Sequence, residues 1–595
     1  MELLYFYLEK SDFFNDMSAD LGSDLTFQII NNELIITENK NYIPNFFGSS
    51  LKENQKTQIT NFNCIVGENG TGKSTLLKSF INIINNNYTM PFLVVFKEKG
   101  KYYYFSKKTT TIIYNKVLLK DTKNIVYKNI EIHFKKPNPS SFSTVFFSNV
   151  FDLNTNFIEL EEVTNISTMN LVKERPIEYF TEEMKKQILF SAKYEEDLNL
   201  KSIIKIPDLL SISFYLGTDT FDLTNFSLNI DEELEEIFDY AFERKSVFER
   251  KVGEELYKEM LRELYKDIND ISSKYSVFLS QELREALYHT RDPRDITNFF
   301  KALIGKLKVF QNKKYVEIFK NKYEKKYNDL IVNTEKLYNA ISVLTKKFSI
   351  GKDKPISVSK KSSVFKQFFE LYLFSEIDYR FIEFKWENLS SGEAAFLSLF
   401  GRFESINKGI ARNVIIFIDE GELYFHPKWQ QDWVKLFVDT ITYIYKEKKI
   451  QILMTTHSPF ILSDLPSSNV ILLKKEISIE NHSVSKIKNL ENHPLTFGSN
   501  IQELFSNSFF LKSGLTGTFA RNKINNIVNQ LIDPNEEIQS DEDLRKVIEM
   551  IAEPVVRRKL IDLYNEKVNL NLLSIDKKIQ YLQEEINQLK KAHNG

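Results

Sequence analysis

The sequence has few of the features that mark secreted, membrane-bound or strongly charged proteins. Its 595 residues include one cysteine, Cys64, which excludes internal disulfides and cysteine-based zinc sites and suits a reducing cytoplasm. No run approaches the roughly 18 apolar residues of a membrane helix, and the start, MELLYFYLEKSD, lacks the basic and long apolar parts of a signal peptide. The 79 basic and 81 acidic residues nearly cancel, so any contact with nucleic acid must be local. We therefore expect a cytoplasmic protein that does not enter a membrane.

Changes in the residue pattern along the chain predict four regions. Residues 1–177 contain short β-branched and aromatic runs separated by polar turns, which indicates strands, with one helix in STLLKSFINII. Residues 178–385 carry long charged stretches with apolar residues three and four positions apart, which predicts a large helical insertion. The runs VIIFI, QILMTT and VILLKK alternate with helical segments in 386–495, and 496–595 is predicted to be a helical tail. This alternation indicates an α/β fold with a parallel sheet that helices flank.

The stretch GENGTGKST, residues 67–75, follows the apolar run NCIV and precedes a helical pattern. It fits G-x-x-x-x-G-K-[ST] in the strand, turn and helix context that this motif requires. The glycines let backbone N–H groups close around phosphates, and the helix N-terminus adds partial positive charge. Lys73 is expected to reach the β- and γ-phosphates, and the Ser74 hydroxyl to ligate Mg²⁺. The nucleotide-binding residues predicted in this loop are Gly67, Asn69, Gly70, Gly72, Lys73, Ser74 and Thr75.

An acidic pair follows the apolar strand VIIFI. Asp419 emerges at the carboxyl end of this strand, where open α/β sheets place ligands, and is expected to hold Mg²⁺, largely through water. Glu420 is expected to polarise the attacking water as a general base. His457 follows the next strand, QILMTT, where it can hydrogen-bond a γ-phosphate; a purely structural role is the alternative.

The segment LSSGE, residues 389–393, leads into an apolar-periodic helix and predicts a second anion site at a helix N-terminus. Ser390, Gly392 and Glu393 are its candidate nucleotide-binding residues. In the alternative interpretation Ser390 is a simple N-cap, and Glu393 completes a capping box. The position of the segment, ahead of the acidic strand, favours the nucleotide.

The ordered set GENGTGKS, LSSGE, VIIFIDE and TTHSP resembles the ATP-binding-cassette (ABC) ATPases, in particular their SMC-like branch. The resemblance implies that 1–177 and 386–495 form one P-loop ATPase head, with a mixed β lobe and a parallel-sheet α/β lobe. It also implies that heads join as a homodimer or higher oligomer around ATP and Mg²⁺. Each ATP would contact Lys73 and Ser74 of one head and Ser390 and Gly392 of the other.

Two positions depart from the usual pattern of that branch, and one further motif of the branch has candidates in this chain. Ser391 stands where glycine is usual, and Glu393 where glutamine is common. Ser148 and Asn149, after the strand STVFF, are candidates for the Mg²⁺-binding Gln loop.

The segment GELYFHPKWQQ (421–431) resembles relatives in the overcoming-lysogenization-defect (OLD) family and bacterial defence ATPases. The tail, including IAEPVVRRKLIDLYNEK (551–567), is similar to the PtuA-type ATPase subunits of Septu and of retron-associated antiphage systems. This resemblance implies a sensor or regulatory ATPase that controls a separately encoded effector, such as an HNH-type nuclease. A retron reverse transcriptase and its non-coding RNA would be further partners. The alternatives are a DNA-tethering repair ATPase and a self-contained OLD-type nuclease, whose metal site would use the acidic cluster at 541–543.

Two further segments have the composition of contact surfaces. Residues 301–361 hold 16 lysines and five acidic residues, a net charge of +11, with tyrosines between them, and could follow nucleic-acid phosphates. In the alternative they pair with residues 231–260, whose net charge is −6, as a helical hairpin. Near the C-terminus an apolar seam predicts a three-heptad helix that docks on its own body, another copy or a partner: Val568, Leu572, Ile575, Ile579, Leu582, Ile586 and Leu589.

Overall fold

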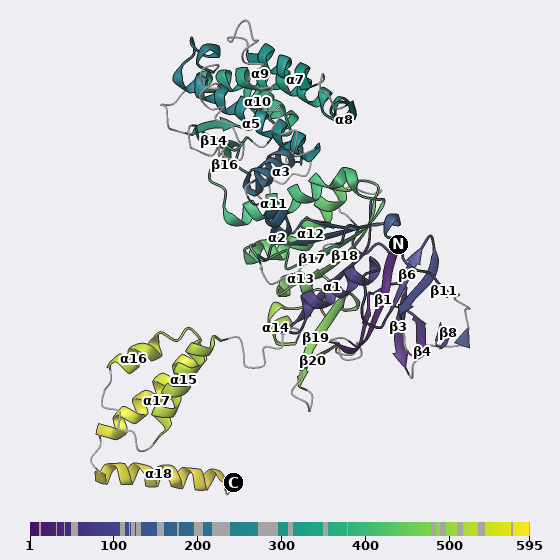
Figure 1. Cartoon of the computed structure of the whole chain (residues 1–595). Coiled ribbons are helices and arrows are strands. Elements are labelled where there is room, and N and C mark those ends of the chain that lie inside the picture. Colours follow the sequence, from purple (N-terminus) through teal and green to yellow (C-terminus); the bar gives the residue numbers. More distant parts are fainter. Residues whose placement is uncertain are drawn as a thin grey trace. The chain divides into compact units, whose positions relative to one another are not determined.

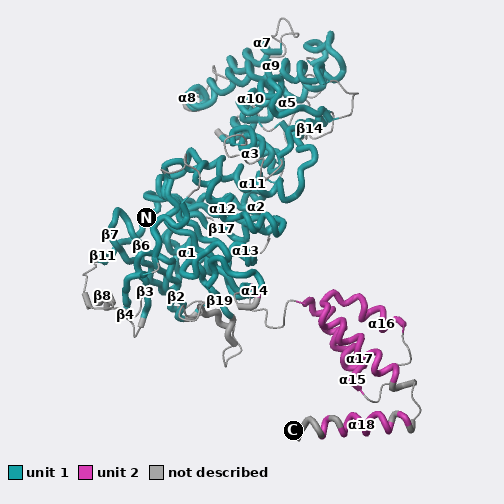
Figure 2. Tube along the Cα trace, turned by 180° about the vertical axis from the view of Figure 1, so that it is seen from behind, with its two compact units in different colours: residues 1–504 teal, residues 505–595 magenta. Residues whose placement is uncertain are grey.

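The structure, a computed structural model, divides the chain into two compact units, residues 1–504 and residues 505–595 (Figure 1; Figure 2). It describes residues 1–593 apart from 11–13, 31–32, 41, 49–56, 108–112, 118, 121–124, 127–131, 152–159, 175, 177, 195–205, 217–237, 272–295, 308–312, 349–354, 378, 478–482, 488–494, 508–515, 534–541 and 573–574.

A seven-stranded sheet is the centre of the first unit. Its strands, in spatial order, are β13 (Val163–Asn165), β12 (Ser143–Ser148), β17 (Asn413–Asp419), β18 (Lys449–Thr455), β5 (Gln58–Gly67), β19 (Val470–Ile477) and β20 (Ser483–Ile487). Neighbouring strands are parallel, except that β20 pairs with β19 in the antiparallel direction. The predicted α/β fold class is confirmed, because strands from both sides of the insertion form one largely parallel sheet.

Helices cover both faces of this sheet. α1 (Lys73–Ile84) packs on the face that carries Ile65 and Leu453. α12 (Pro427–Ile444) lies on the other face, where the rings of Trp433 and Phe62 meet edge to face. Phe62 and Ile65 point to opposite faces because side chains alternate along a strand. Cys64 is fully buried in the same strand. In the part of the chain that the structure describes, no helix is long and apolar enough to cross a bilayer.

A β lobe packs beside α1. A five-stranded sheet has the order β11 (Ile132–Phe134), β7 (Lys101–Lys107), β6 (Phe92–Glu98), β1 (Glu2–Lys10) and β2 (Asn15–Asp20). One face contacts α1, where the rings of Phe6 and Phe80 stack 4.0 Å apart. On its other face, Leu4 and Val95 pack with Phe27 of a small three-stranded sheet. That sheet and the adjoining short strands are β3 (Leu25–Ile30), β4 (Glu33–Glu38), β8 (Ile113–Val117), β9 (Leu119–Lys120) and β10 (Ile125–Val126).

The segment predicted to be a helical insertion has its own hydrophobic core and is not entirely helical. It adds an antiparallel sheet in the order β15 (Ile356–Ser359), β14 (Leu209–Phe214) and β16 (Ile382–Trp386) (Figure 1). The all-helical expectation was wrong at these strands, two of which, ISVS and IEFKW, alternate apolar and polar residues as a half-buried strand does. Its helices are α3 (Tyr179–Tyr194), α5 (Val247–Ile271), α7 (Ile296–Leu307), α8 (Lys313–Lys322), α9 (Glu324–Lys347) and α10 (Ser363–Phe374).

The lysine-rich segment pairs with the acidic helix α5 where both are described. Lys326 Nζ lies 2.6 Å from Asp267 Oδ2 and 3.2 Å from Glu263 Oε1, and Lys346 Nζ lies 3.0 Å from Glu249 Oε1. The described tyrosines of the segment are buried in the core of the insertion: Tyr323, Tyr327 and Tyr338. The Lys346–Glu249 pair is a contact of the helical-hairpin alternative, whereas Glu263 and Asp267 lie beyond the acidic residues 231–260 of that alternative. The side chains of Lys313 and Lys314 lie outside the described residues.

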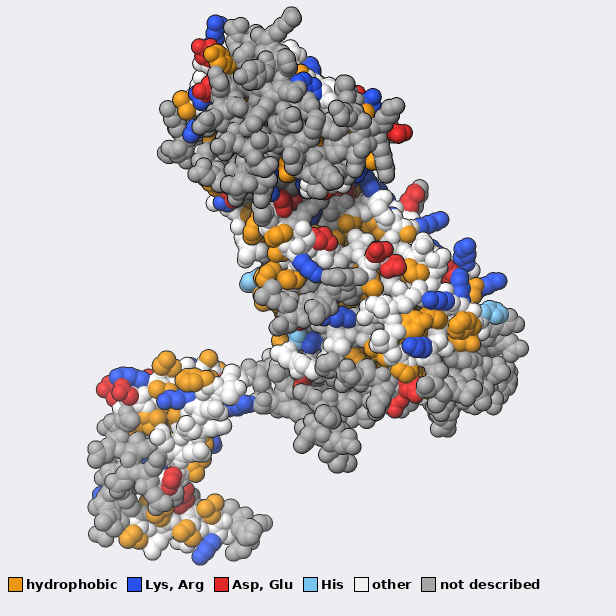
Figure 3. All heavy atoms as spheres, viewed as in Figure 1, with side chains coloured by type: hydrophobic (Ala, Val, Ile, Leu, Met, Phe, Trp, Pro, Cys, Tyr) orange, Lys and Arg blue, Asp and Glu red, His pale blue; other side chains and the backbone are white. Residues whose placement is uncertain are grey.

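The second unit has a small core of its own, which includes Ile527, Ile548 and Leu560. Its helices are α15 (Thr518–Ile532), α16 (Glu542–Glu549), α17 (Pro554–Leu572) and α18 (Ile575–His593). The division between the units, after residue 504, falls within α14 (Ile501–Asn507). Hydrophobic side chains are also exposed on its surface, among them Phe519 and Met550 (Figure 3).

The predicted three-heptad helix is wrong as a single element, because α17 ends at Leu572 and α18 begins at Ile575. The heptad pattern continues across Asn571 and Ser574, residue types of weak helix propensity, so periodicity alone does not reveal the boundary. The described seam residues of α18 are 49% to 66% exposed: Ile579, Leu582, Ile586 and Leu589.

The acidic cluster proposed for a nuclease metal site begins a helix. Glu542 and Asp543 lie in the first turn of α16, and both are within ion-pair distance of Lys546; position 541 is outside the described residues. Within the described ranges, no group of three or more His, Cys, Asp or Glu side chains could hold a metal ion by itself.

Candidate nucleotide-binding site

The glycine-rich loop joins the end of β5 to the start of α1 and depends on glycine at defined points. Gly70 and Gly72 have φ of 76° and 85°, in the left-handed region that glycine adopts without strain. A Cβ at Gly72 would lie 3.0 Å from the ring of Phe14, and a Cβ at Gly67 would lie 2.5 Å from the Leu473 carbonyl oxygen. Thr71 closes the loop by donating from its N–H and its hydroxyl to the Glu68 carbonyl oxygen.

The loop offers an anion site at the N-terminus of α1. Gly72 is the N-cap residue and has no side chain, so it cannot bond the N–H groups of the first turn. Lys73 is 6% exposed, and its Nζ donates to the carbonyl oxygens of Gly67 at 3.1 Å and Glu68 at 3.2 Å. Burial lowers the pKa of Lys73, while Glu420 and Asp419 oppose that shift. Uncapped N–H groups and a cation beside them suit a phosphate. Asn69 lies exposed in this loop, and Thr75 lies in the first turn of α1.

Asp419 connects the loop to the acidic strand. It is the last residue of β17, and in the sheet it stands beside Ser148 of β12 and Thr455 of β18. Its Oδ1 accepts hydrogen bonds from the Ser74 hydroxyl at 2.9 Å and from the Thr455 hydroxyl at 2.5 Å. Burial raises the pKa of Asp419, and these two hydroxyl donors partly offset the rise. The Ser74 and Asp419 oxygens are therefore close enough to share one Mg²⁺, a cation that prefers oxygen ligands.

Glu420 and His457 meet at the same edge of the sheet. The Glu420 backbone has φ of 50°, a strained value for a non-glycine residue, and its N–H donates to the Thr455 hydroxyl at 3.1 Å. His457 Nε2 lies 3.4 Å from Glu420 Oε1. The imidazole beside it holds the pKa of Glu420 below its usual value, although burial acts in the other direction. This carboxylate therefore stays ionised to a lower pH than an ordinary glutamate.

The segment 389–393 forms the capping box that the structural alternative required. The Ser390 hydroxyl accepts from the Glu393 N–H at 3.3 Å, and Glu393 Oε2 accepts from the Ser390 N–H at 2.8 Å at the start of α11 (Ser391–Ser405). A Cβ at Gly392 would lie 3.0 Å from the ring of Trp429 of α12. Ser390 and Ser391 are exposed. Within the described residues, these contacts join the segment to α12 and its preceding turn, not to the glycine-rich loop of the same chain.

The Gln-loop candidates lie at the edge of the sheet beside the acidic strand. Asn149 is buried, and its Oδ1 accepts from the Thr168 hydroxyl at 3.5 Å. Its side-chain Nδ2 is buried with no hydrogen-bond partner among the described residues. The short helices that follow the strands at this edge are α2 (Thr168–Glu174) and α13 (Pro459–Ser463).

Sequence reasoning missed three residues that organise the site: Thr455, Glu422 and Arg402. The Thr455 hydroxyl donates to the Asp419 carboxylate and accepts from the Glu420 N–H. The Glu422 carboxylate accepts from the His457 N–H. Thr455 lies two positions before His457 in the motif TTHSP, but a threonine at the end of a strand gives no sign that it will bond the acidic pair. Arg402 is the only cationic side chain in the helical run EAAFLSLFGRF, which was a usable signal.

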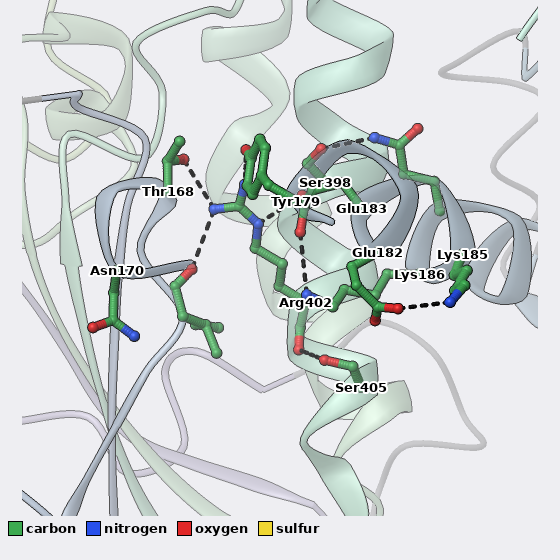
Figure 4. Close-up of polar contacts among 12 residues, drawn as sticks. Thr168, Asn170, Tyr179, Glu182, Glu183, Lys185, Lys186, Ser398, Arg402 and Ser405 are labelled. Atoms are coloured by element: carbon green, nitrogen blue, oxygen red, sulfur yellow. Dashed lines mark hydrogen bonds and ion pairs between the residues drawn. The ribbon is translucent and has the colours of Figure 1, made fainter. Parts of the chain in front are cut away.

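Arg402 joins α11 to the insertion (Figure 4). It is 2% exposed, and its Nε donates to Glu183 Oε2 of α3 at 2.8 Å. Its Nη1 donates to the Ile166 carbonyl oxygen and the Thr168 hydroxyl, and its Nη2 donates to the Tyr179 hydroxyl. One buried guanidinium thus ties the helix after the Ser390 segment to the first helix of the insertion and to the edge of the sheet.

Known proteins share features with much of this chain. A family model described as AAA ATPase domain matches residues 42–462. The Retron Ec83 probable ATPase of Escherichia coli is 34% identical over 94 residues, which are 14% of this chain and 16% of that protein. The Retron Vc95 probable ATPase of Vibrio cholerae serotype O1 biovar El Tor is 30% identical over 96 residues, 15% of this chain and 18% of that protein. The matched segments thus span less than a fifth of either relative.

Replacing Arg402 by methionine should weaken the contact between α11 and α3 by about 3 kcal/mol, because it leaves the buried Glu183 carboxylate short of its closest cation. Lys186, at 3.3 Å, compensates only in part. Native-state hydrogen exchange of the amides in α3 and α11 measures the loss. In the matched double variant Arg402→Met with Glu183→Gln, most of the protection should return. Unchanged exchange in Arg402→Met would contradict the assigned role.

Proposed function

The chain belongs to the AAA ATPase domain family, and from that premise we propose that two copies of this ATPase bind ATP between them. Lys73 and Ser74 of one copy hold the phosphates and Mg²⁺, together with the rest of the loop from Gly67 to Thr75 and Asp419. Ser390, Gly392 and Glu393 of the other copy face the γ-phosphate. The observation that carries this proposal is the exposed N-terminus of α11, which makes no described contact with the glycine-rich loop of its own chain.

Hydrolysis at this site uses groups that the sheet edge brings together. Ser74 and Asp419 would hold Mg²⁺, which would supply positive charge to offset that of the phosphates. Lys73, already buried against the loop, binds the β- and γ-phosphates. Glu420 accepts a proton from the attacking water, and its lowered pKa keeps it in the basic form. His457 hydrogen-bonds the γ-phosphate, and its imidazole lies beside the Glu420 carboxylate, with Nε2 3.4 Å from Oε1.

The ATPase is the sensor or regulatory subunit of a cytoplasmic bacterial antiphage system of the retron type. Two relatives named as retron probable ATPases support this assignment, as does the resemblance of the tail to PtuA-type subunits of Septu. The controlled effector is a separately encoded nuclease of the HNH type, with a retron reverse transcriptase and its non-coding RNA as further partners. The exposed apolar side chains of the second unit suit such contacts.

Co-purification from the native operon tests the regulatory role. A tagged chain expressed with its genomic neighbours should bring down an effector protein in a fixed ratio. A Lys73→Ala chain in the same operon should lose protection against phage, because it cannot bind the nucleotide. A chain that is always isolated alone, and that protects cells without any neighbouring gene, would contradict the assignment.

Two substitutions separate hydrolysis from dimer formation. Glu420→Gln should bind ATP but hydrolyse it about 10²–10³-fold more slowly, which traps a dimer. Ser390→Arg should bind ATP and stay monomeric, because the long arginine side chain occupies the space where the second copy and its nucleotide would approach. Mass in solution with and without ATP measures both effects, and Lys73→Ala is the control that binds no nucleotide. Wild-type turnover in Glu420→Gln, or an ATP-dependent dimer of Ser390→Arg, would overturn the respective assignment.

The acid limb of the pH profile of kcat/KM for ATP should move to higher pH in His457→Ala. The folded-state pKa of Glu420 is lowered by His457, so the base loses activity only below its usual pKa. Without the imidazole this pKa rises toward its ordinary value, and protonation of Glu420 begins at a higher pH. His133→Ala, a change in the β lobe, should leave the limb in place. A limb that stays fixed or moves to lower pH in His457→Ala would count against the pairing.

A further inference from the structure

We propose that Glu422 is a positioning residue for ATP hydrolysis: its carboxylate fixes the loop that carries His457 against the turn that carries Glu420. This inference rests on the proposed roles of His457 and Glu420 and adds the group that holds them in register. Glu422 was not among the residues that the sequence motifs pointed to.

Glu422 lies in the turn between β17 and α12 and is 4% exposed. Its Oε1 accepts a hydrogen bond from the Thr456 hydroxyl and a second one from the His457 backbone N–H at 3.0 Å. The turn is closed by its own backbone, since the Phe425 N–H donates to the Glu422 carbonyl oxygen at 2.9 Å. One carboxylate oxygen therefore links the residues that follow β17 to those that follow β18.

The three residues after β18 are fixed from several sides. The Thr456 N–H donates to the Ile65 carbonyl oxygen of β5 at 3.2 Å, and the Ser458 N–H donates to the Thr456 hydroxyl at 3.0 Å. Glu422 Oε1 accepts from the Thr456 hydroxyl and from the His457 N–H, while the Ser458 hydroxyl is buried without a hydrogen-bond partner among the described residues. The backbone is thus held, while the imidazole stays 39% exposed and 3.4 Å from the Glu420 carboxylate.

A carboxylate is an unfavourable choice for packing alone. Burial raises the pKa of Glu422, and the nearby Glu420 carboxylate adds to the rise, while the Thr456 and His457 donors oppose it. Glu422 Oε2 is buried without a hydrogen-bond partner among the described residues. An apolar side chain would avoid these penalties but would leave two donors of the His457 loop without an acceptor. The geometry therefore assigns the residue to the loop and not to the hydrophobic core.

The comparison of Glu422→Ala with Glu422→Gln tests the proposal on the full chain with Mg²⁺ and ATP. Alanine removes the acceptor, and kcat should fall about 30- to 100-fold, because a displacement of about 1 Å at a reacting group has an effect of that order. KM for ATP should stay within about twofold, since Lys73 and the glycine-rich loop are unchanged. Glutamine keeps one carbonyl oxygen as an acceptor and should restore kcat to within about fivefold of the wild type. A wild-type kcat in folded Glu422→Ala would overturn the inference.

A double-variant cycle distinguishes this inference from the proposed function itself. Because Glu422 acts through His457, the variant Glu422→Ala with His457→Ala should be no slower than His457→Ala alone. If His457→Ala lowers kcat and the double variant lowers it by the product of the two single effects, the role of Glu422 is overturned and that of His457 stands. A wild-type rate in His457→Ala would instead defeat the proposed function of His457.

Thr456→Val provides an independent variant if Glu422→Ala does not fold. Valine keeps the shape of the side chain but removes the hydroxyl, which donates to Glu422 and accepts from the Ser458 N–H. The expected result is a kcat about three- to tenfold lower with KM unaltered, since one of the two anchoring hydrogen bonds remains. A folded Thr456→Val chain with wild-type kcat would contradict the proposal.

Discussion

The hydrogen bond between the Ser74 hydroxyl and the Asp419 carboxylate joins residues that are 345 positions apart, and the geometry of the site depends on it. It can form because β17, β18 and β5 are adjacent and in register, with Asp419 opposite Thr455 and Thr455 opposite Ile65. The parallel sheet therefore closes a very long loop. The entropic cost of closing a loop grows only slowly with its length.

Buried charge is used at points where separate parts of the chain must keep a fixed relation. Arg402 connects α11, α3 and the residues after β13, while Glu422 connects the turns after β17 and β18. Each of these groups would be costly to bury alone, and each is hydrogen-bonded to a different segment of the chain, although Glu422 uses only one of its two carboxylate oxygens. The lysines of α9 that pair with α5 are more exposed and contribute less stability.

The parts of the fold that could be predicted from the sequence are those with a local signal. The glycine-rich turn, the apolar strands of the central sheet and the acidic pair after VIIFI are visible within ten residues, and the fold class follows from their alternation. The sheet of the insertion was missed although ISVS and IEFKW alternate apolar and polar residues, because each covers only four or five residues between long helical stretches. The end of α17 was missed because a heptad pattern continues through it. Glu422 and Thr455 were missed because their roles come from partners on another strand, which no local pattern encodes.

The complete burial of Cys64 gives this chain a practical property. Burial raises the pKa of its thiol well above the usual value, so very little reactive thiolate forms, and the side chain is inaccessible in the folded protein. A single cysteine introduced at an exposed position of α11 or α18 would therefore be the one site that a maleimide dye or spin label modifies in the native chain. Fluorescence transfer or electron resonance could then follow each unit during a turnover cycle without a cysteine-free background having to be built first.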